Sequence, residues 1–245
     1  MTVGLRADRP LGLAVRPSPV LVLLSLALAT WLTLDLILQG PASAFDEFVS
    51  DAVGKWEVGD NDFRYGICWT ITQIGGQRAL ILIVMAVLVS YLCWTRKTLQ
   101  PLVRTLVALL LLTVTVYAFK YGLGRTAPAY PGSYLHRGGQ SYPSGHTANA
   151  VLMWGLATWL AVYYGLPVRV QRSFAALFVL SPLASAVTML LLNFHWVTDL
   201  VTGAAVGIVL LWLLHLIFDG RLGQWTGTSD SRTQRRTAPK ASVPA

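Results

Sequence analysis

Two histidines of this chain lie in short polar motifs, each of which opens a long apolar run. His146 ends the motif Pro-Ser-Gly-His, and His195 begins the motif His-Trp-Val-Thr-Asp, which ends at Asp199. His195 and Asp199 are four residues apart, so on a helix the carboxylate can accept a hydrogen bond from one imidazole nitrogen. The other ring nitrogen would then serve as a base or a nucleophile. The alternative is an interfacial histidine beside an acid that the helix dipole favours.

The residues before His146 suit the binding of an anion. Ser144 is placed to cap the helix that begins after it, because a serine oxygen accepts hydrogen bonds from the first-turn N–H groups. These N–H groups, with that of Gly145 among them, point outward together with the positive end of the helix dipole. The alternative is a plain serine cap followed by a glycine turn.

Cations gather close to these motifs in the sequence. Lys120 follows a third apolar run, and Arg125 and Arg137 lie in the glycine-rich segment after it. Cations that offset the charge of a phosphoryl group are what phosphoryl transfer requires. The alternative is that they are interfacial side chains that extend toward water.

Together these residues favour metal-free transfer of a phosphoryl group through a phosphohistidine. In this hypothesis His195 attacks phosphorus, Asp199 orients it, and His146 protonates the leaving alkoxide or phosphate. His146 then acts as the base for the hydrolytic water. We expect no metal site and no cofactor, because no cysteine or further carboxylate joins the group. The predicted phosphate-binding residues are Lys120, Arg125, Ser144 and Gly145.

The composition is that of a membrane protein. Of the 245 residues, 54% are hydrophobic and 12% are charged, and the mean hydropathy is +0.56. A soluble chain usually carries about 25% charged residues. The net charge of +8 lies in short segments between apolar runs, which is typical of membrane topology and contact with anionic lipids. A nucleic-acid partner is therefore disfavoured.

The apolar runs predict an all-α fold, a polytopic bundle of six transmembrane helices. A short interfacial helix is expected within residues 40–62, in the first outer loop, where Phe45, Phe48 and Trp56 recur at helical spacing. Gly75 and Gly76 would permit a kink or a close helix contact. The six spans are expected near residues 20–38, 79–94, 102–119, 147–164, 174–192 and 197–218.

Three regions follow from this pattern. Residues 1–19 are a basic cytoplasmic tail, residues 20–218 form the membrane domain, and residues 219–245 are a basic tail expected to be disordered. The first apolar run is longer than the usual core of a signal peptide, so it is expected to be retained. Small residues at 42–44 leave cleavage as the alternative. Asp35, near the end of this run, is expected to be a partly solvated helix-end acid.

The distribution of lysine and arginine predicts the orientation of the chain. The tails and the segments around residues 96–104 and 169–172 are rich in cations, and the opposite segments hold fewer. Because cation-rich short loops stay in the cytoplasm, both termini are expected there. Lys120, His146 and His195 would then meet at the outer face of a cell membrane.

The order and spacing of these motifs resemble the type 2 phosphatidic acid phosphatase superfamily of membrane lipid phosphatases, which also contains soluble vanadium haloperoxidases. The family pattern is Lys, six residues, Arg-Pro; then Pro-Ser-Gly-His; then Ser-Arg, five residues, His, three residues, Asp. The resemblance covers about residues 79–218. Its most specific part is Pro-Ser-Gly-His followed, some fifty residues later, by His195 and Asp199.

Two positions depart from the family pattern. Counted from Lys120, the first motif's arginine falls on Ala127, although Pro128 is present. Counted back from His195, the Ser-Arg pair falls on Thr188 and Met189. Arg125 lies two residues early in a glycine-rich loop and is expected to replace one missing clamp, with Arg137 as a weaker substitute.

The resemblance implies a metal-independent phosphatase that acts on a lipid phosphate or pyrophosphate, with a polyprenyl carrier as one candidate. Two alternatives stay open on the same scaffold. A lipid phosphotransferase would use an alcohol in place of water, and a non-catalytic lipid-phosphate binder or transport component would explain the missing arginines. A soluble haloperoxidase is disfavoured, because six apolar spans leave no water-soluble core.

Overall fold

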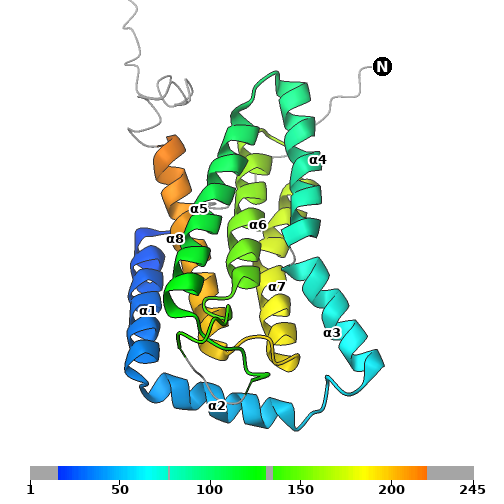
Figure 1. The fold of residues 1–245 in the computed structure, drawn as a ribbon. Coiled ribbons are helices and arrows are strands. Elements are labelled where there is room, and N and C mark those ends of the chain that lie inside the picture. The colour runs from blue at the N-terminus through cyan, green and yellow to red at the C-terminus, as the bar shows by residue number, and fades with distance from the viewer. Residues whose placement is uncertain (1–15, 77, 131–134, 220–245) are drawn as a thin grey trace, which may run out of the picture.

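The computed structural model of the chain describes residues 16–76, 78–130 and 135–219. These residues form eight α-helices and no β-strand, which confirms the predicted all-α class (Figure 1). Most of the two predicted tails lies outside the described residues. The helices are α1 (Pro19–Leu38), α2 (Pro41–Gly54), α3 (Asp62–Gly75), α4 (Arg78–Arg96), α5 (Gln100–Leu123), α6 (Gly145–Tyr163), α7 (Val168–Leu191) and α8 (Val197–Asp219).

Five segments of the described residues are long and apolar enough to cross a membrane, which supports a multi-pass membrane protein. They are α1, the segment Asp62–Arg96 that contains α3 and α4, then α5, α7, and Val197–Phe218 of α8. The predicted fourth span, α6, is not among them. The count of six spans therefore stays a prediction.

Helix α6 is the centre of the bundle (Figure 1). It packs against α4, α5, α7 and α8, and its residues from Thr147 to Ala161 are all buried. Because protein rather than lipid surrounds it, α6 accommodates polar side chains such as Asn149 and Thr158. Thr158, for example, donates to the carbonyl of Trp154 at 2.8 Å.

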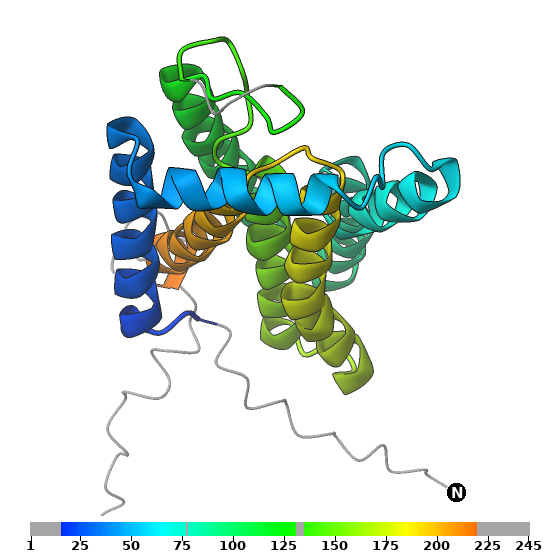
Figure 2. The same ribbon diagram turned by 90° about the horizontal axis from the view of Figure 1, so that it is seen from below.

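Helix α2 lies across one end of the bundle and joins α1 to α3 (Figures 1 and 2). It is the helix predicted within residues 40–62, and its place at a membrane surface stays a prediction. Phe45 and Phe48 are 52% and 70% exposed, whereas Asp46 between them is 1% exposed and points into the bundle. Asp35 is buried rather than partly solvated, and its carboxylate accepts a hydrogen bond from the Ser43 N–H in the first turn of α2.

The predicted kink lies between α3 and α4. Helix α3 ends at Gly75, and α4 begins at Arg78. The carbonyls at the break are satisfied by neighbouring helices: Ser181 of α7 donates to Gly75, and Asn149 of α6 donates to Gly76. A Cβ atom at Gly76 would overlap the Ser185 hydroxyl and lie 2.9 Å from the Cβ of His146. Only glycine lets the break come this close to His146.

The polar motifs share one end of the bundle. The C-terminal end of α5 and the N-terminal ends of α6 and α8 lie beside α2 (Figure 1). Lys120 and His146 lie in the ends of α5 and α6, and His195 lies two residues before α8. The prediction that they meet on one side is therefore consistent with the fold, whereas the side of the membrane on which they lie stays a prediction.

Candidate active site

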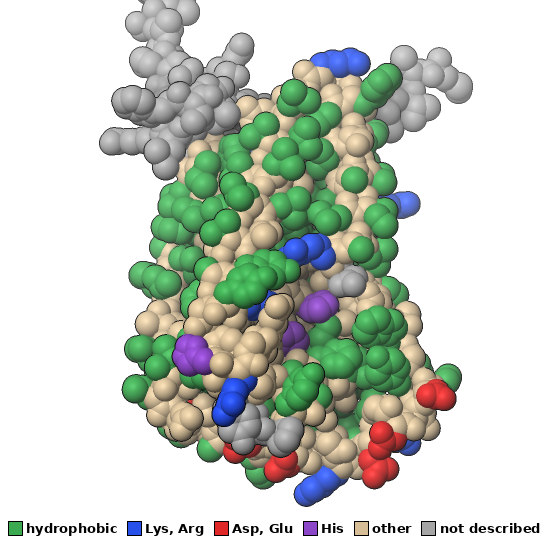
Figure 3. Space-filling model, viewed as in Figure 1, with side chains coloured by type: hydrophobic (Ala, Val, Ile, Leu, Met, Phe, Trp, Pro, Cys, Tyr) green, Lys and Arg blue, Asp and Glu red, His purple; other side chains and the backbone are tan. Residues whose placement is uncertain are grey.

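A cavity of about 770 Å³ opens at this end of the bundle, and we call it the polar cavity after the histidine, lysine and amide side chains among those that line it. Figure 3 shows histidine side chains in a hollow on this face, with lysine or arginine side chains beside them. The residues that line the cavity are Trp69, Gln73, Lys120, Ala127, Ala129, Tyr130, Gly138, Gly139, Gln140, Ser141, His146, Met189, Asn193, Phe194 and His195.

The two histidines face each other across this cavity. Their ring centroids are 6.2 Å apart and the ring planes make an angle of 67°. His146 lies in the first turn of α6, and His195 lies two residues before α8. Reacting atoms approach to about 3–3.5 Å before bond formation. The two imidazoles therefore lie close enough to act on different atoms of one phosphate group.

Asp199 holds the far side of the His195 ring. Its Oδ2 atom is 3.3 Å from Nδ1 of His195, and it also accepts the Trp196 backbone N–H at 3.0 Å. The Asp199 side chain is fully buried. Because Nδ1 is the nitrogen that faces the carboxylate, Nε2 is the nitrogen left for chemistry.

The residues just before α6 contact α8 at Asp199. Ser144 is the N-cap of α6, as the sequence predicts: its Oγ atom accepts the Thr147 N–H at 3.4 Å and the Thr147 hydroxyl at 3.1 Å. Its own N–H donates to the carbonyl of Asp199 at 2.9 Å. Ser144 is fully buried and does not line the cavity. Its predicted contact with phosphate stays a prediction.

Lys120 lines the cavity, and Gly145 lies beside Lys120 but does not line the cavity itself. The ammonium of Lys120 donates to the carbonyl of Gln140, so it is held toward the loop that covers this end. A Cβ atom at Gly145 would lie 3.9 Å from Cε of Lys120. The first-turn N–H groups of α6 and the lysine therefore approach the same region, as phosphate binding would require.

Arg125 has a different place from the one expected. It is 0% exposed, and its Nη1 and Nη2 atoms donate to Asp199 Oδ1 at 2.6 Å and to Asp46 Oδ2 at 2.8 Å. Neither Arg125 nor Arg137 lines the cavity. Their predicted contacts with phosphate stay predictions.

Ala127 and Met189 do line the cavity. These are the positions to which the family pattern assigns arginines, so the wall faces the histidines with uncharged side chains at both. Sequence reasoning found this pair by counting from the motifs.

Two charged residues near the site were not found from the sequence. Arg78 begins α4, and its charge acts on Lys120 and His146. Its guanidinium carbon is 6.0 Å from the ring centroid of Tyr117, one turn before Lys120 on α5. The sequence feature that could have pointed to Arg78 is its position two residues after Gly76. The second residue, Asp46, carries no local signal, because its partners lie on other segments of the chain.

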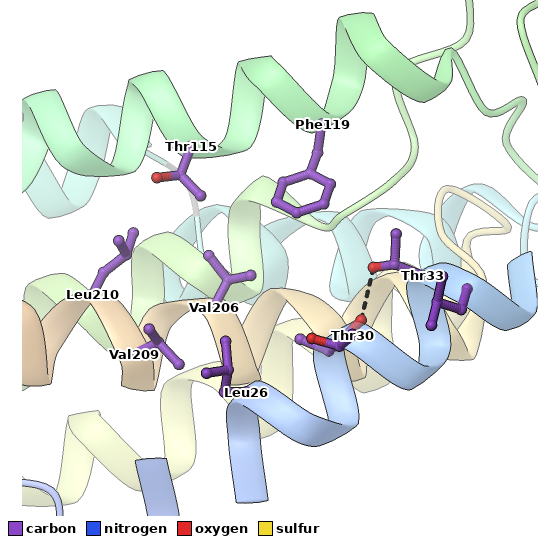
Figure 4. A pocket seen from close by; sticks show the side chains of 10 residues that line it. Leu26, Thr30, Thr33, Thr115, Phe119, Val206, Val209 and Leu210 are labelled. Atoms are coloured by element: carbon purple, nitrogen blue, oxygen red, sulfur yellow. Dashed lines mark hydrogen bonds between the residues drawn. The ribbon is translucent and has the colours of Figure 1, made fainter. Parts of the chain in front are cut away.

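An apolar cavity of about 350 Å³ lies between α1, α5 and α8 (Figure 4). Thr33 and Phe119 line one end of it. The hydroxyl of Tyr142 is 2.8 Å from that of Thr33 and donates to Thr202 at 3.1 Å, and its ring packs edge-on against Phe119. Tyr142 is fully buried and follows Ser141, which lines the polar cavity. Tyr142 therefore contacts residues that line the apolar cavity and adjoins, in sequence, a residue that lines the polar cavity.

The chain has recognisable relatives in sequence and in fold. Residues 101–222 match the family model of the PAP2 superfamily. The fold is similar to that of the first transmembrane PAP2 type phosphatidylglycerolphosphate phosphatase from Bacillus subtilis, with a TM-score of 0.56 and 20% sequence identity over 80% of this chain and 92% of that one. No curated protein sequence matches the chain significantly. The family match includes Lys120, His146 and His195, and the chain belongs to the PAP2 superfamily.

Proposed function

We propose that this protein is an integral membrane phosphatase that hydrolyses a lipid phosphate or pyrophosphate through a phosphohistidine. The observation that carries the proposal is the pair of imidazoles, 6.2 Å apart across a cavity that Lys120 also lines. The carboxylate behind one ring makes the two histidines unequal. That difference suits one nucleophile and one acid–base group.

In the first step, Nε2 of His195 attacks phosphorus and forms a P–N bond. The bond from phosphorus to the leaving oxygen breaks, and His146 in its protonated form gives that oxygen a proton. Asp199 accepts the hydrogen bond from Nδ1 and offsets the positive charge that develops on the ring of His195. The products of this step are a lipid alcohol or lipid phosphate and phosphorylated His195.

In the second step, water attacks the phosphorylated His195. His146, now neutral, takes a proton from the water as the new P–O bond forms. The P–N bond breaks, its electron pair returns to Nε2 of His195, and inorganic phosphate leaves. No metal ion or cofactor takes part in this scheme.

The phosphate oxygens would be held by Lys120 and by the first-turn N–H groups of α6, beginning at Gly145. Arg78 would add positive potential from the start of α4. A lipid substrate is supported by the five apolar segments, by the PAP2 superfamily match and by the fold shared with a phosphatidylglycerolphosphate phosphatase. The outer face is the side that the distribution of lysine and arginine favours.

A lipid phosphotransferase is the second candidate, and one observation favours it. Ala127, Met189 and Phe194 form an uncharged part of the cavity wall. Such a wall suits the organic part of an acceptor alcohol better than it suits a second phosphate oxygen. In that case the alcohol would replace water in the second step, and His195 and Asp199 would keep their roles.

The test compares His195→Asn with His136→Asn in purified protein, with a panel of lipid phosphates and pyrophosphates and no added metal. His136 is an exposed loop residue outside the cavity, and its φ of 57° suits asparagine. We expect His195→Asn to lower phosphate release by at least about 10³-fold. We expect His136→Asn to leave phosphate release unchanged.

Three other results would redirect the proposal. Equal release by the two variants would contradict the phosphohistidine. Transfer of phosphate to an added alcohol, with little free phosphate, would identify the phosphotransferase. Binding of a lipid phosphate by the wild-type protein without turnover of any substrate would identify a non-catalytic binder.

A further inference from the structure

Three buried charged side chains connect helix α2 to the imidazole of His195. They are Asp46, Arg125 and Asp199, which are 1%, 0% and 0% exposed. Asp46 and Arg125 do not line the polar cavity. They therefore lie behind the site, on the side of Asp199 that faces away from the substrate.

Each oxygen of Asp199 has its own partners. Oδ1 accepts Nη1 of Arg125 at 2.6 Å, whereas Oδ2 faces Nδ1 of His195 and the N–H of Trp196. The carboxylate plane is therefore fixed from both sides. A rotation of Asp199 that improved one set of contacts would break the other.

Arg125 is fixed in turn by Asp46. Nη2 of the guanidinium donates to Asp46 Oδ2 at 2.8 Å, and Asp46 Oδ1 accepts the backbone N–H of Thr198 at 2.9 Å. The hydroxyl of Thr198 also accepts Nη1 of Arg125 at 2.8 Å. The Arg125 guanidinium carbon lies 5.1 Å from the Trp196 ring centroid, so an aromatic face bounds it as well.

The burial of these groups makes the arrangement costly to change. Burial raises the pKa of Asp46 above its ordinary value, and the charge of Arg125 and the hydrogen bonds from Thr198 act in the opposite direction. A buried charge that loses its partner is strongly destabilised. If Arg125 turned toward a phosphate, it would leave two buried carboxylates without their counter-charge.

We propose that Arg125 and Asp46 are positioning residues that hold Asp199 with Oδ2 directed at His195. Arg125 sets the carboxylate through Oδ1, and Asp46 sets Arg125 from the side of α2. Helix α2 thus supports the nucleophile although none of its residues lines the polar cavity. The inference rests on the proposed function, because it assigns these residues a role in the reaction of His195.

The decisive variant is Asp46→Asn. It preserves the shape of the side chain and the acceptor for the Thr198 N–H, but it removes the charge that holds Arg125. Asp51→Asn is the matched control, since Asp51 is an exposed aspartate on the same helix. Arg125→Lys is the second variant: it keeps the charge but loses the planar fork that bridges two carboxylates. Removing Arg125 altogether risks misfolding, so the lysine variant is preferred.

The experiment measures kcat, KM and the melting temperature of each variant in detergent, with the lipid phosphate that the wild-type protein hydrolyses. We expect Asp46→Asn and Arg125→Lys each to lower kcat about tenfold or more, since misorientation of a reacting group lowers the rate. KM is expected to stay within about twofold, because neither residue contacts the substrate. Asp51→Asn should match the wild type. The double variant should be no slower than the slower single variant, because both act through one contact.

Other results would overturn the inference. An unchanged kcat in Asp46→Asn, even with a lower melting temperature, would reduce Asp46 to a structural role. A raised KM with unchanged kcat in Arg125→Lys, together with wild-type kinetics in Asp46→Asn, would make Arg125 a phosphate-binding residue instead. Activity that persists in His195→Asn would reject the proposed function itself. Loss of activity in His195→Asn, together with a wild-type kcat in Asp46→Asn, would reject only the positioning role.

Discussion

The phosphate that the proposed reaction requires would carry more negative charge than Lys120 alone can offset. Ala127 and Met189 supply no charge at the cavity wall. Arg78 is the nearby cation whose charge acts on both Lys120 and His146. It approaches from α4, and therefore from a different direction than either family arginine. The positive potential of the site is thus assembled from two helices.

This arrangement predicts the effect of Arg78→Gln. We expect kcat/KM for the lipid phosphate to fall by about tenfold, which corresponds to about 1.4 kcal/mol of transition-state stabilisation. Arg96→Gln is the matched control, because Arg96 ends the same helix at the other end of the bundle and donates to the carbonyl of Tyr164. Steady-state kinetics would check the pair. Equal values of kcat/KM for the two variants would contradict a role for Arg78 in the site.

Spacing along the chain was enough to predict some residue contacts but not others. His195 and Asp199 are only four positions apart, so helix geometry predicts their contact from the sequence. Arg125 and Asp46 are 79 residues apart, and Asp46 and Thr198 are 152 apart. Contacts of that kind depend on how α2 packs on the bundle, which no local pattern contains. The sequence therefore predicts a contact of Arg125 with the substrate, whereas in the structure Arg125 donates to Asp199, Asp46 and Thr198.

At the scale of elements, the segment before α6 rests directly on α8. The N–H of Ser144 donates to the carbonyl of Asp199. Gly203, one turn further along α8, faces the same segment: a Cβ atom there would overlap the carbonyl oxygen of Ser144. The absence of a side chain at Gly203 therefore sets the distance between the two histidine-bearing elements.

Gly203→Ala should separate these elements. We expect a loss of about 1–3 kcal/mol in stability, as for an overpacked core, together with reduced phosphate release. Gly122→Ala is the control, because Gly122 lies in α5 with nothing within 4 Å of a Cβ atom. It should be neutral or stabilise the protein by up to about 1 kcal/mol. Melting curves in detergent would compare the two. A wild-type melting temperature and activity in Gly203→Ala would show that the contact has no such importance.

The elements themselves were largely predictable. Five of the six predicted spans fall on segments of the described residues that are long and apolar enough to cross a membrane. The aromatic spacing predicts α2, and the glycine pair predicts the break between α3 and α4. The apolar run near residues 147–164 predicts α6 as a further span. Its burial among four other helices is compatible with the polar side chains that it carries, since a helix that does not touch lipid has no need of an apolar surface. Which helix would be central cannot be found from hydropathy alone.

For the whole molecule, the open question of orientation has a direct test. Arg137 lies in the loop at the end that holds the polar cavity, and Lys97 lies between α4 and α5 at the opposite end. Both are exposed. Lysine and arginine are more frequent at the end of the bundle that holds Lys97, which favours a cytoplasmic location for that end.

The test uses single cysteines in a background where Cys68 and Cys93 are replaced by alanine. In intact cells, a membrane-impermeant maleimide should label Arg137→Cys and leave Lys97→Cys unlabelled. Permeabilised cells should show labelling of both, which controls for exposure of each thiol. The reverse result in intact cells would place the proposed active site on the cytoplasmic side.

The position of Tyr142 affects how surrounding lipids would interact with such an enzyme. Its buried ring packs against Phe119, which lines the apolar space between α1, α5 and α8, and its hydroxyl contacts Thr33 and Thr202. A lipid tail that entered this space would therefore meet Phe119 and Thr33, with Tyr142 behind them, rather than the two histidines. Such a tail would leave the polar cavity open to a phosphate group.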